Sequence, residues 1–202
     1  MTQPLTPTET RPDGKALGIL RAAFEVFARY GVRRTSMQDI AREAGMSRAA
    51  LYLHFRNKDD IVQSLARHYY DQARADVRAA LAAHPDPAAA LDAAFAAQGG
   101  EGARLILTSP HGAELLDAKQ SHCAEIVAEG EAALAAIYAA WLDRLAGEGR
   151  VTLDAAEGDT RAVAETMLVA LHGLKAGAPD YDSYRASAAR LARLFGQGLR
   201  PR

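Results

Sequence analysis

Apolar residues near the start of the chain recur with the period of an amphipathic helix. Four of them lie three or four positions apart and would share one helix face: Leu17, Leu20, Phe24 and Phe27. Asp13 can cap the start of this helix, and Gly31 follows its expected last residue, Tyr30. The pattern therefore predicts a first helix over residues 14–30.

Two short helices are predicted next. Ser36 can cap the first of them, and Asp39 stands three positions later, which is the spacing of a capping box. After a stop at Gly45, Ser47 can cap a second short helix over residues 48–55. Two short helices joined by a tight turn with glycine form a helix-turn-helix pattern. In DNA-binding proteins the second helix of this pattern enters the major groove, but the same shape also occurs in proteins that bind no DNA.

The remaining sequence also has helical character. It contains 45 Ala and 22 Leu against eight Val and six Ile over the whole chain, which favours helices over strands. Asn57 can cap a fourth helix that runs from Lys58 towards Ala83. Further helices are predicted over residues 87–98, 104–108, 114–145 (one or two helices), 160–176 and after Asp182 or Ser183. Only residues 150–153 could form a short strand, so the expected fold class is all-α.

Charge is distributed unevenly along the chain. Residues 1–58 contain ten Lys and Arg against five Asp and Glu, whereas residues 59–202 contain 14 against 20. A basic N-terminal segment suits a polyanionic partner. Chance asymmetry on a solvated surface is an equally good explanation of the charge alone.

Composition limits where the chain is expected to act. Its longest apolar run, Ala132–Leu142, has 11 residues, whereas a membrane span needs about 18. Residues 1–12 contain three prolines and no apolar core of a signal peptide, so we expect a disordered arm there. The single cysteine, Cys123, excludes a disulfide framework and indicates a reducing compartment. We therefore expect a cytoplasmic protein.

Residues 35–58 read T-S-M-Q-D-I-A-R-E-A-G-M-S-R-A-A-L-Y-L-H-F-R-N-K. This segment closely resembles the DNA-binding domain of the TetR family of bacterial transcriptional regulators. The matching elements are Thr35-Ser36, Ile40-Ala41, Ala44-Gly45-Met46-Ser47, Leu51-Tyr52, His54-Phe55 and Lys58, with Ala23-Phe24, Phe27 and Gly31 upstream. The specific resemblance covers about residues 13–60, and the rest of the chain matches only in length and helical character.

The resemblance implies a ligand-responsive transcription factor, which we expect to be a homodimeric repressor released from double-stranded operator DNA by a small-molecule effector. It implies a DNA-binding domain over residues 13–58 and a helical domain for effector binding and dimerisation over residues 59–202. These residues do not distinguish repression from activation, and they do not identify the effector or the operator sequence. The sequence predicts no cofactor and no membrane partner.

Ten residues are expected to contact DNA: Arg34, Thr35, Ser36, Gln38, Arg48, Ala49, Tyr52, Leu53, His54 and Lys58. Arg48 stands in the first turn of the third helix, where a guanidinium can bind guanine, with a phosphate contact as the alternative. Ala49 and Leu53 would make apolar contacts. Lys58 would bind the phosphate backbone, as would the start of the second helix, where free N–H groups favour an anion.

The resemblance also places an effector pocket among the central helices and a dimer interface on the last two. Candidate effector contacts are His68, Tyr69, Gln72, Leu105, His111, Leu115, Cys123, Tyr138, Trp141, Met167 and His172. Each of these has an alternative role in packing, and Cys123 is either an inert buried thiol or a sensor of oxidants. Candidate interface residues are Val163, Met167, Leu171, Leu174, Tyr184, Ala188, Leu191 and Phe195, for which packing within one chain is the alternative.

Catalysis has little support in the sequence. The G-x-S-x-G, G-x-x-x-x-G-K-[ST] and H-E-x-x-H motifs are absent, so we expect no enzyme and no catalytic or metal-binding residues. Two alternatives remain: a helical interaction module whose N-terminal segment binds no DNA, and a helical enzyme with a metal among His111, Glu114, His122 and Cys123.

Overall fold

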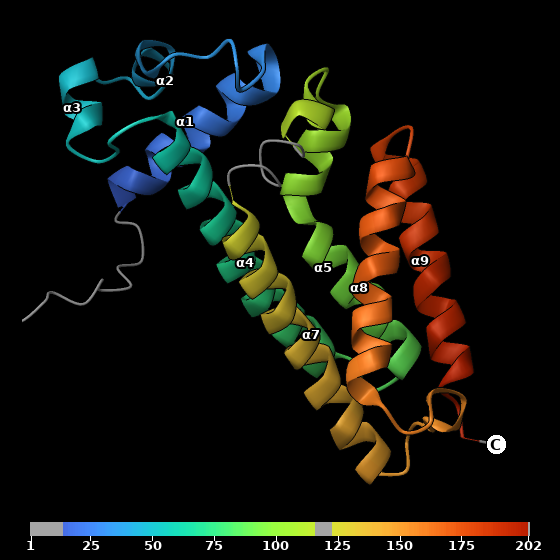
Figure 1. Ribbon diagram of the computed structural model, residues 1–202. Coiled ribbons are helices and arrows are strands. Elements are labelled where there is room, and N and C mark those ends of the chain that lie inside the picture. The colour runs from blue at the N-terminus through green and yellow to red at the C-terminus, as the bar shows by residue number, and fades with distance from the viewer. Residues whose placement is uncertain (1–13, 116–122, 202) are drawn as a thin grey trace, which may run out of the picture.

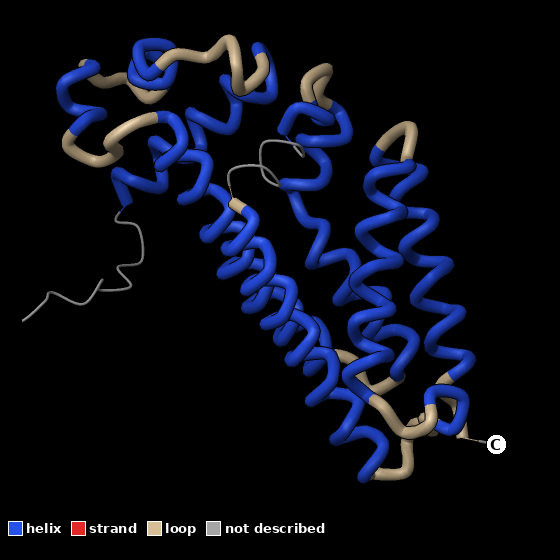
Figure 2. Tube along the Cα trace, in the orientation of Figure 1, coloured by secondary structure: helices blue, strands red, loops and turns tan. Residues whose placement is uncertain are grey.

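The computed structural model describes residues 14–115 and 123–201. Its described elements are α1 (Gly14–Tyr30), α2 (Met37–Glu43), α3 (Arg48–Tyr52), α4 (Lys58–Ala83), α5 (Pro87–Thr108), α7 (Ala124–Gly147), the 3₁₀ turn η1 (Asp154–Ala156), α8 (Thr160–Gly177) and α9 (Tyr181–Gly198). Within these residues there is no strand, so the all-α fold class is confirmed (Figure 2). No helix in the described part of the chain is both long and apolar enough to span a bilayer.

Local sequence signals account for most helix ends. The Ser36 side chain accepts a hydrogen bond from the Asp39 N–H, and Asp39 accepts one from the Ser36 N–H, which confirms the capping box. Ser47 and Asn57 cap α3 and α4 in the same way. Gly31 ends α1 with a φ of +85°, a left-handed conformation that suits glycine.

The helices form two hydrophobic cores. One lies at one end of the molecule and joins α1, α2, α3 and the first turns of α4; we call this part the head (Figure 1). The second core lies between the long helices, where α5 packs on α4 and α9, and α7 packs on α4 and α8; we call this part the body. Helix α4 runs without a break from one core into the other.

Two expectations about secondary structure need correction, and one is confirmed. The pattern over residues 87–108 predicted two helices, and α5 consists of two helical stretches that meet at a kink at Gly100 (φ 51°, ψ −161°). Helix α3 ends at Tyr52, three residues earlier than predicted, because Leu53 already forms its C-cap. Residues 150–153 form a loop, and the Thr152 N–H donates to the Leu199 carbonyl instead of to a strand partner. The expected arm over residues 1–12 lies outside the described residues.

Candidate DNA-binding surface and effector cavity

The outer face of α3 is open to solvent. Arg48, Ala49, Tyr52 and His54 are exposed, and Leu53 keeps 86% of its surface accessible. The inward side of the same helix carries Leu51, which is fully buried in the head. Five of the ten predicted DNA contacts, on α3 and directly after it, therefore face solvent together.

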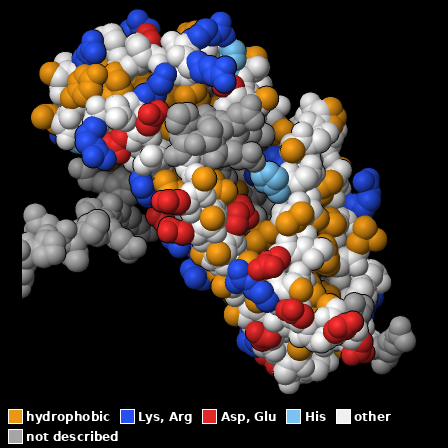
Figure 3. Space-filling model, viewed as in Figure 1, with side chains coloured by type: hydrophobic (Ala, Val, Ile, Leu, Met, Phe, Trp, Pro, Cys, Tyr) orange, Lys and Arg blue, Asp and Glu red, His pale blue; other side chains and the backbone are white. Residues whose placement is uncertain are grey.

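Arg48 is held in place by Tyr52, one helical turn later. Its Nη2 donates to the Tyr52 hydroxyl over 3.3 Å, and its guanidinium lies 5.5 Å from the centre of the tyrosine ring. Within the described residues no carboxylate pairs with Arg48, so its charge remains available to an anionic partner. On the face shown in Figure 3, Lys and Arg side chains gather over the head, whereas Asp and Glu are frequent at the far end of the body.

The start of α2 also meets solvent. Ser36 and Gln38 are exposed. The Ser36 hydroxyl donates to the Asp39 carboxylate over 2.6 Å, and this bond holds the pKa of Asp39 below its usual value, with a smaller contribution from Arg42. The Ser36 hydroxyl is thus engaged in the cap, while the amide of Gln38 is available at the surface.

Two predicted phosphate contacts have their polar side-chain groups bonded inside the head. Thr35 keeps only 3% of its surface, and its hydroxyl donates to the Gly31 carbonyl over 2.7 Å. The Lys58 ammonium donates to three loop carbonyls: Val32 at 2.6 Å, Thr35 at 2.9 Å and Arg33 at 3.3 Å. An ammonium has three N–H donors, so this set occupies all of them. Lys58 fastens the loop between α1 and α2 to the start of α4.

Arg34 is exposed, but it is bonded to the body. Its Nε donates to the Tyr30 carbonyl, and its Nη2 lies 3.0 Å from Nε2 of His111. Because arginine can only donate, His111 accepts through this nitrogen. The backbone N–H of Arg33 donates to Oε1 of Glu114 over 2.6 Å, and the Ser109 hydroxyl donates to the Ala28 carbonyl over 2.5 Å.

These bonds join the head to residues 109–115, which follow α5. A Cβ at Gly31 would overlap the end of the flexible Glu114 side chain, which could shift, so it is the positive φ that favours glycine there. Leu115 and the buried Cys123, which come much later in the sequence, also pack in the core of the head. Head and body are therefore linked by this segment as well as by α4.

A cavity of about 430 Å³ lies between α1, α4 and α5. Its apolar wall includes Phe24, Phe27, Val32, Val62, Leu65, Leu105, Ile106 and Leu115. Its polar wall includes Arg21, His68, Tyr69, Gln72, Asp76, Gln98, Glu101 and Lys175. The break in α5 at Gly100 lies in this wall. The volume is in the range of small-molecule sites, roughly 300–1,000 Å³.

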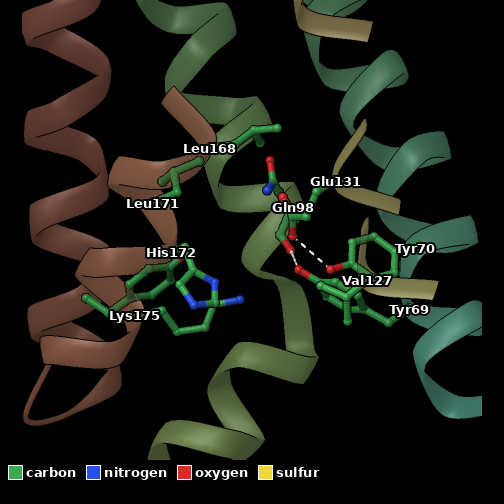
Figure 4. Close-up of a pocket in the computed structure, with 10 residues that line it drawn as sticks. Tyr69, Tyr70, Gln98, Val127, Glu131, Leu168, Leu171, His172 and Lys175 are labelled. Carbon is green, nitrogen blue, oxygen red and sulfur yellow. Dashed lines mark hydrogen bonds between the residues drawn. The ribbon is translucent and has the colours of Figure 1, made fainter. Parts of the chain in front are cut away.

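A second cavity of about 40 Å³ adjoins it in the body (Figure 4). Tyr69, Gln98 and Lys175 line both cavities, whereas Glu131 and His172 line only the small one. The Tyr69 hydroxyl donates to the Gln98 carbonyl, and the Tyr70 hydroxyl donates to Glu131 over 2.8 Å. Burial, with a smaller effect of Glu131, raises the pKa of Tyr69 and of Tyr70, so both phenols stay neutral.

Five of the eleven predicted effector contacts line the large cavity, and one more lines the small cavity. The large cavity is lined by His68, Tyr69, Gln72, Leu105 and Leu115, and the small one by Tyr69 and His172. Four predictions are corrected because the residue is buried elsewhere or already bonded. Met167 lies in the body core, Cys123 lies in the head core, His111 binds Arg34, and Trp141 lies by Arg78 in a groove between α4 and α7.

Tyr138 lies one layer behind the cavity, with its hydroxyl donating to the Gln98 side chain over 3.0 Å. The sequence interpretation missed α1 as a wall, in particular Phe24 and Phe27, and it missed Lys175 on α8. The pairing of Phe24 and Phe27 on one helix face could have indicated a shared apolar wall. Nothing in the sequence placed Lys175 beside Tyr69.

Most of the predicted dimer contacts pack inside the protomer. Five are buried by neighbouring helices of the same chain: Val163, Met167, Leu171, Tyr184 and Ala188. Leu174, Leu191 and Phe195 are half-buried, and the last two pack on the body core. The large apolar side chains that α8 and α9 expose are Val169 and Leu194, with 73% and 64% of their surface accessible.

Among residues 14–115 and 123–201, no three His, Cys, Asp or Glu side chains come together as metal ligands would. His122, one of the four candidate ligands, lies outside these residues. His111 and Glu114 face the head instead, 3.8 Å apart between Nδ1 and Oε2.

Residues 19–65 match the family model described as bacterial regulatory proteins, tetR family. The N-terminal segment of the chain is thus similar to the TetR-family DNA-binding domain. Among curated relatives, the transcriptional repressor BepR of Brucella suis is 41% identical over 70 residues. That alignment covers 34% of this chain and 34% of BepR, so the sequence likeness spans about a third of the relative.

Solved structures extend the likeness in fold to nearly the whole chain. FadR, a fatty acid degradation regulator from Bacillus halodurans, has a TM-score of 0.69 at 20% identity, with 96% of this chain and 100% of FadR covered. SmeT, the repressor of a multidrug efflux pump of Stenotrophomonas maltophilia, has a TM-score of 0.70 at 18% identity, with 94% and 92% covered. At these identities the likeness shows a shared fold alone.

Proposed function

We propose that the chain is a homodimeric, ligand-responsive transcriptional repressor of the TetR type that acts on operator DNA in the cytoplasm. The observation that carries this proposal is the outer face of α3, where Tyr52 orients Arg48, which pairs with no carboxylate of the described residues, beside the exposed Leu53. Residues 13–58 would act as the DNA-binding domain, and residues 59–202 as the effector and dimerisation domain. We assign no reaction to the chain.

Base recognition would fall to Arg48 and the apolar side chains of α3, and positioning on the phosphates to the start of α2. A guanidinium can bind O6 and N7 of guanine together. Gln38 and the free N–H groups at the start of α2 would meet the backbone. Two heads related by a two-fold axis would read half-sites about 34–36 Å apart or a multiple of this distance.

Effector binding would act through the two connections between cavity and head. Helix α4 carries Leu65 and Tyr69 in the cavity wall and Lys58 at the head. The 109–115 segment carries Leu115 in the wall and Glu114 against the Arg33 N–H. A ligand that fits one arrangement of these walls better than the other shifts the equilibrium between DNA-competent and released heads.

Footprinting of the DNA upstream of the chain's own gene tests this function. We expect protection of a palindromic segment at protein concentrations where unrelated DNA of equal length is unprotected. The charge-neutral variant Arg48→Gln should abolish the footprint, whereas Arg74→Gln, on the body, should leave it intact. Equal binding of both DNAs by the native chain would contradict the proposal.

A further inference from the structure

The polar groups of the large cavity are unequally satisfied. Its two carboxylates already have donors, because Glu101 is paired with Arg104 and Asp76 accepts from Gln72 over 2.8 Å. Its cations do not have acceptors of this kind. Within the described residues, neither Lys175 nor Arg21 has a carboxylate partner.

Lys175 stands where the large and small cavities adjoin. Its ammonium lies 5.6 Å from the centre of the Tyr69 ring, which offers a π face and no ion pair. Among the described residues, the small cavity is lined by one carboxylate, Glu131, which does not line the large cavity and accepts from Tyr70. Tyr69 adds no negative charge, because burial raises the pKa of its phenol. The charge at this end of the large cavity is therefore positive.

Gln98 adds a second donor at the same place. The residue keeps 8% of its surface, and its side-chain oxygen accepts from the Tyr138 hydroxyl. The side-chain nitrogen of Gln98 donates to no atom of the described residues, and the residue lines both cavities. The amide N–H groups of Gln98 can therefore donate to a ligand that supplies an acceptor oxygen.

We propose that the cavity binds an amphipathic carboxylate. This inference rests on the proposed effector site. The carboxylate accepts from the Lys175 ammonium and the Gln98 amide, and the hydrocarbon part lies against Phe24, Leu65 and Leu105. An ammonium ligand would meet Lys175 with like charge, and an alcohol would leave the lysine unpaired. The inferred ligand class is thus a single anionic end group on an apolar body.

Calorimetric titration of the full chain with three ten-carbon probes tests this class. The probes are decanoate, decan-1-ol and decyltrimethylammonium, each kept below its micelle concentration. Decanoate should bind about tenfold more tightly than either of the others, as expected for a buried charge-assisted hydrogen bond. Lys175→Met should remove the preference for decanoate over decanol, while Lys175→Arg should retain it.

Lys15→Met is the matched control, because Lys15 is exposed on α1 away from the cavity lining. It should bind all three probes as the native chain does, and thermal melts should show that every variant is folded. The inference is overturned if the ammonium or the alcohol binds as tightly as decanoate, if Lys175→Met keeps the preference, or if no probe binds. Footprinting without ligand judges the repressor proposal separately, and a footprint unaffected by bound decanoate would contradict only the effector role.

Discussion

Two sets of hydrogen bonds hold the head together at the residue scale: the capping box of Ser36 and Asp39, and the carbonyls around the Lys58 ammonium. The Ser36–Asp39 capping box was predictable because both partners lie within four positions and the bonding pattern is local. Lys58 was assigned to phosphate, yet its partners are three carbonyls 23 to 26 positions earlier. Their convergence depends on how α4 packs against the loop after α1, which the periodicity of either segment does not specify.

Replacing Lys58 by methionine should therefore weaken the head itself. Methionine keeps the apolar stem and removes three donors from carbonyls that are partly buried. We expect a loss of about 1–3 kcal/mol in the free energy of unfolding, measured by urea denaturation. The salt dependence of DNA binding should stay the same. If stability is unchanged and the slope of log affinity against log salt falls by about one, Lys58 binds phosphate after all.

For Arg48, in contrast to Lys58, we expect the main effect on specific DNA binding. Arg48→Ala should cost about 1–3 kcal/mol of specific binding and relax the preference at one base step, since a bidentate base contact is lost. Competition binding against operators substituted at each position would measure this. Arg42→Ala, which removes an arginine already paired with Asp39, should change specificity little. An equal loss on all sequences after Arg48→Ala would indicate a phosphate contact instead.

At the scale of elements, α5 shows what an apolar pattern leaves undecided. Its alanine-rich start and its Arg104–Thr108 end were both predicted as helices, with the glycines between them as a gap. The structure continues the element through Gly99 and breaks it only at Gly100. A pattern of glycines lowers helix propensity but does not say whether the chain turns away or resumes. Packing of α5 on both α4 and α9 decides this.

Gly100→Ala should strain this break. The residue has φ 51° and ψ −161°, a region that is essentially restricted to glycine, although a Cβ added there would meet no other atom within 4 Å. Backbone strain alone should cost about 1–3 kcal/mol of unfolding free energy. If α5 relieves the strain by straightening, probe binding in the cavity should also weaken. Chemical denaturation and calorimetry measure the two effects.

Gly18→Ala is the matched control for Gly100→Ala. Gly18 lies in the helical interior of α1 with open space around it, so alanine should stabilise the chain by about 0.5–1 kcal/mol. Opposite signs at the two glycines would support the role of backbone conformation at Gly100. A stabilising Gly100→Ala would mean that the break has no conformational cost and plays no part in shaping the cavity.

For the whole molecule, the main difference between expectation and structure concerns α8 and α9. Their strongest apolar stripes were taken for a dimer interface, but Met167 and Ala188 are completely buried by the same chain. Burial within one chain and burial between two chains select the same residue types, so the stripe alone does not distinguish them. The family resemblance supplied the order of the elements, while only packing identifies which face remains outside.

A dimer built on α8 and α9 would accordingly use Val169 and Leu194. The double variant Val169→Asp, Leu194→Asp should be monomeric in sedimentation equilibrium, because association would bury two unpaired carboxylates per protomer. Its melting temperature as a monomer should reveal an intact core, since both side chains are exposed. Leu53→Asp, on the head, should remain dimeric and lose only DNA binding. A double variant that stays dimeric would move the interface to another face, and with it the spacing at which two α3 helices could meet DNA.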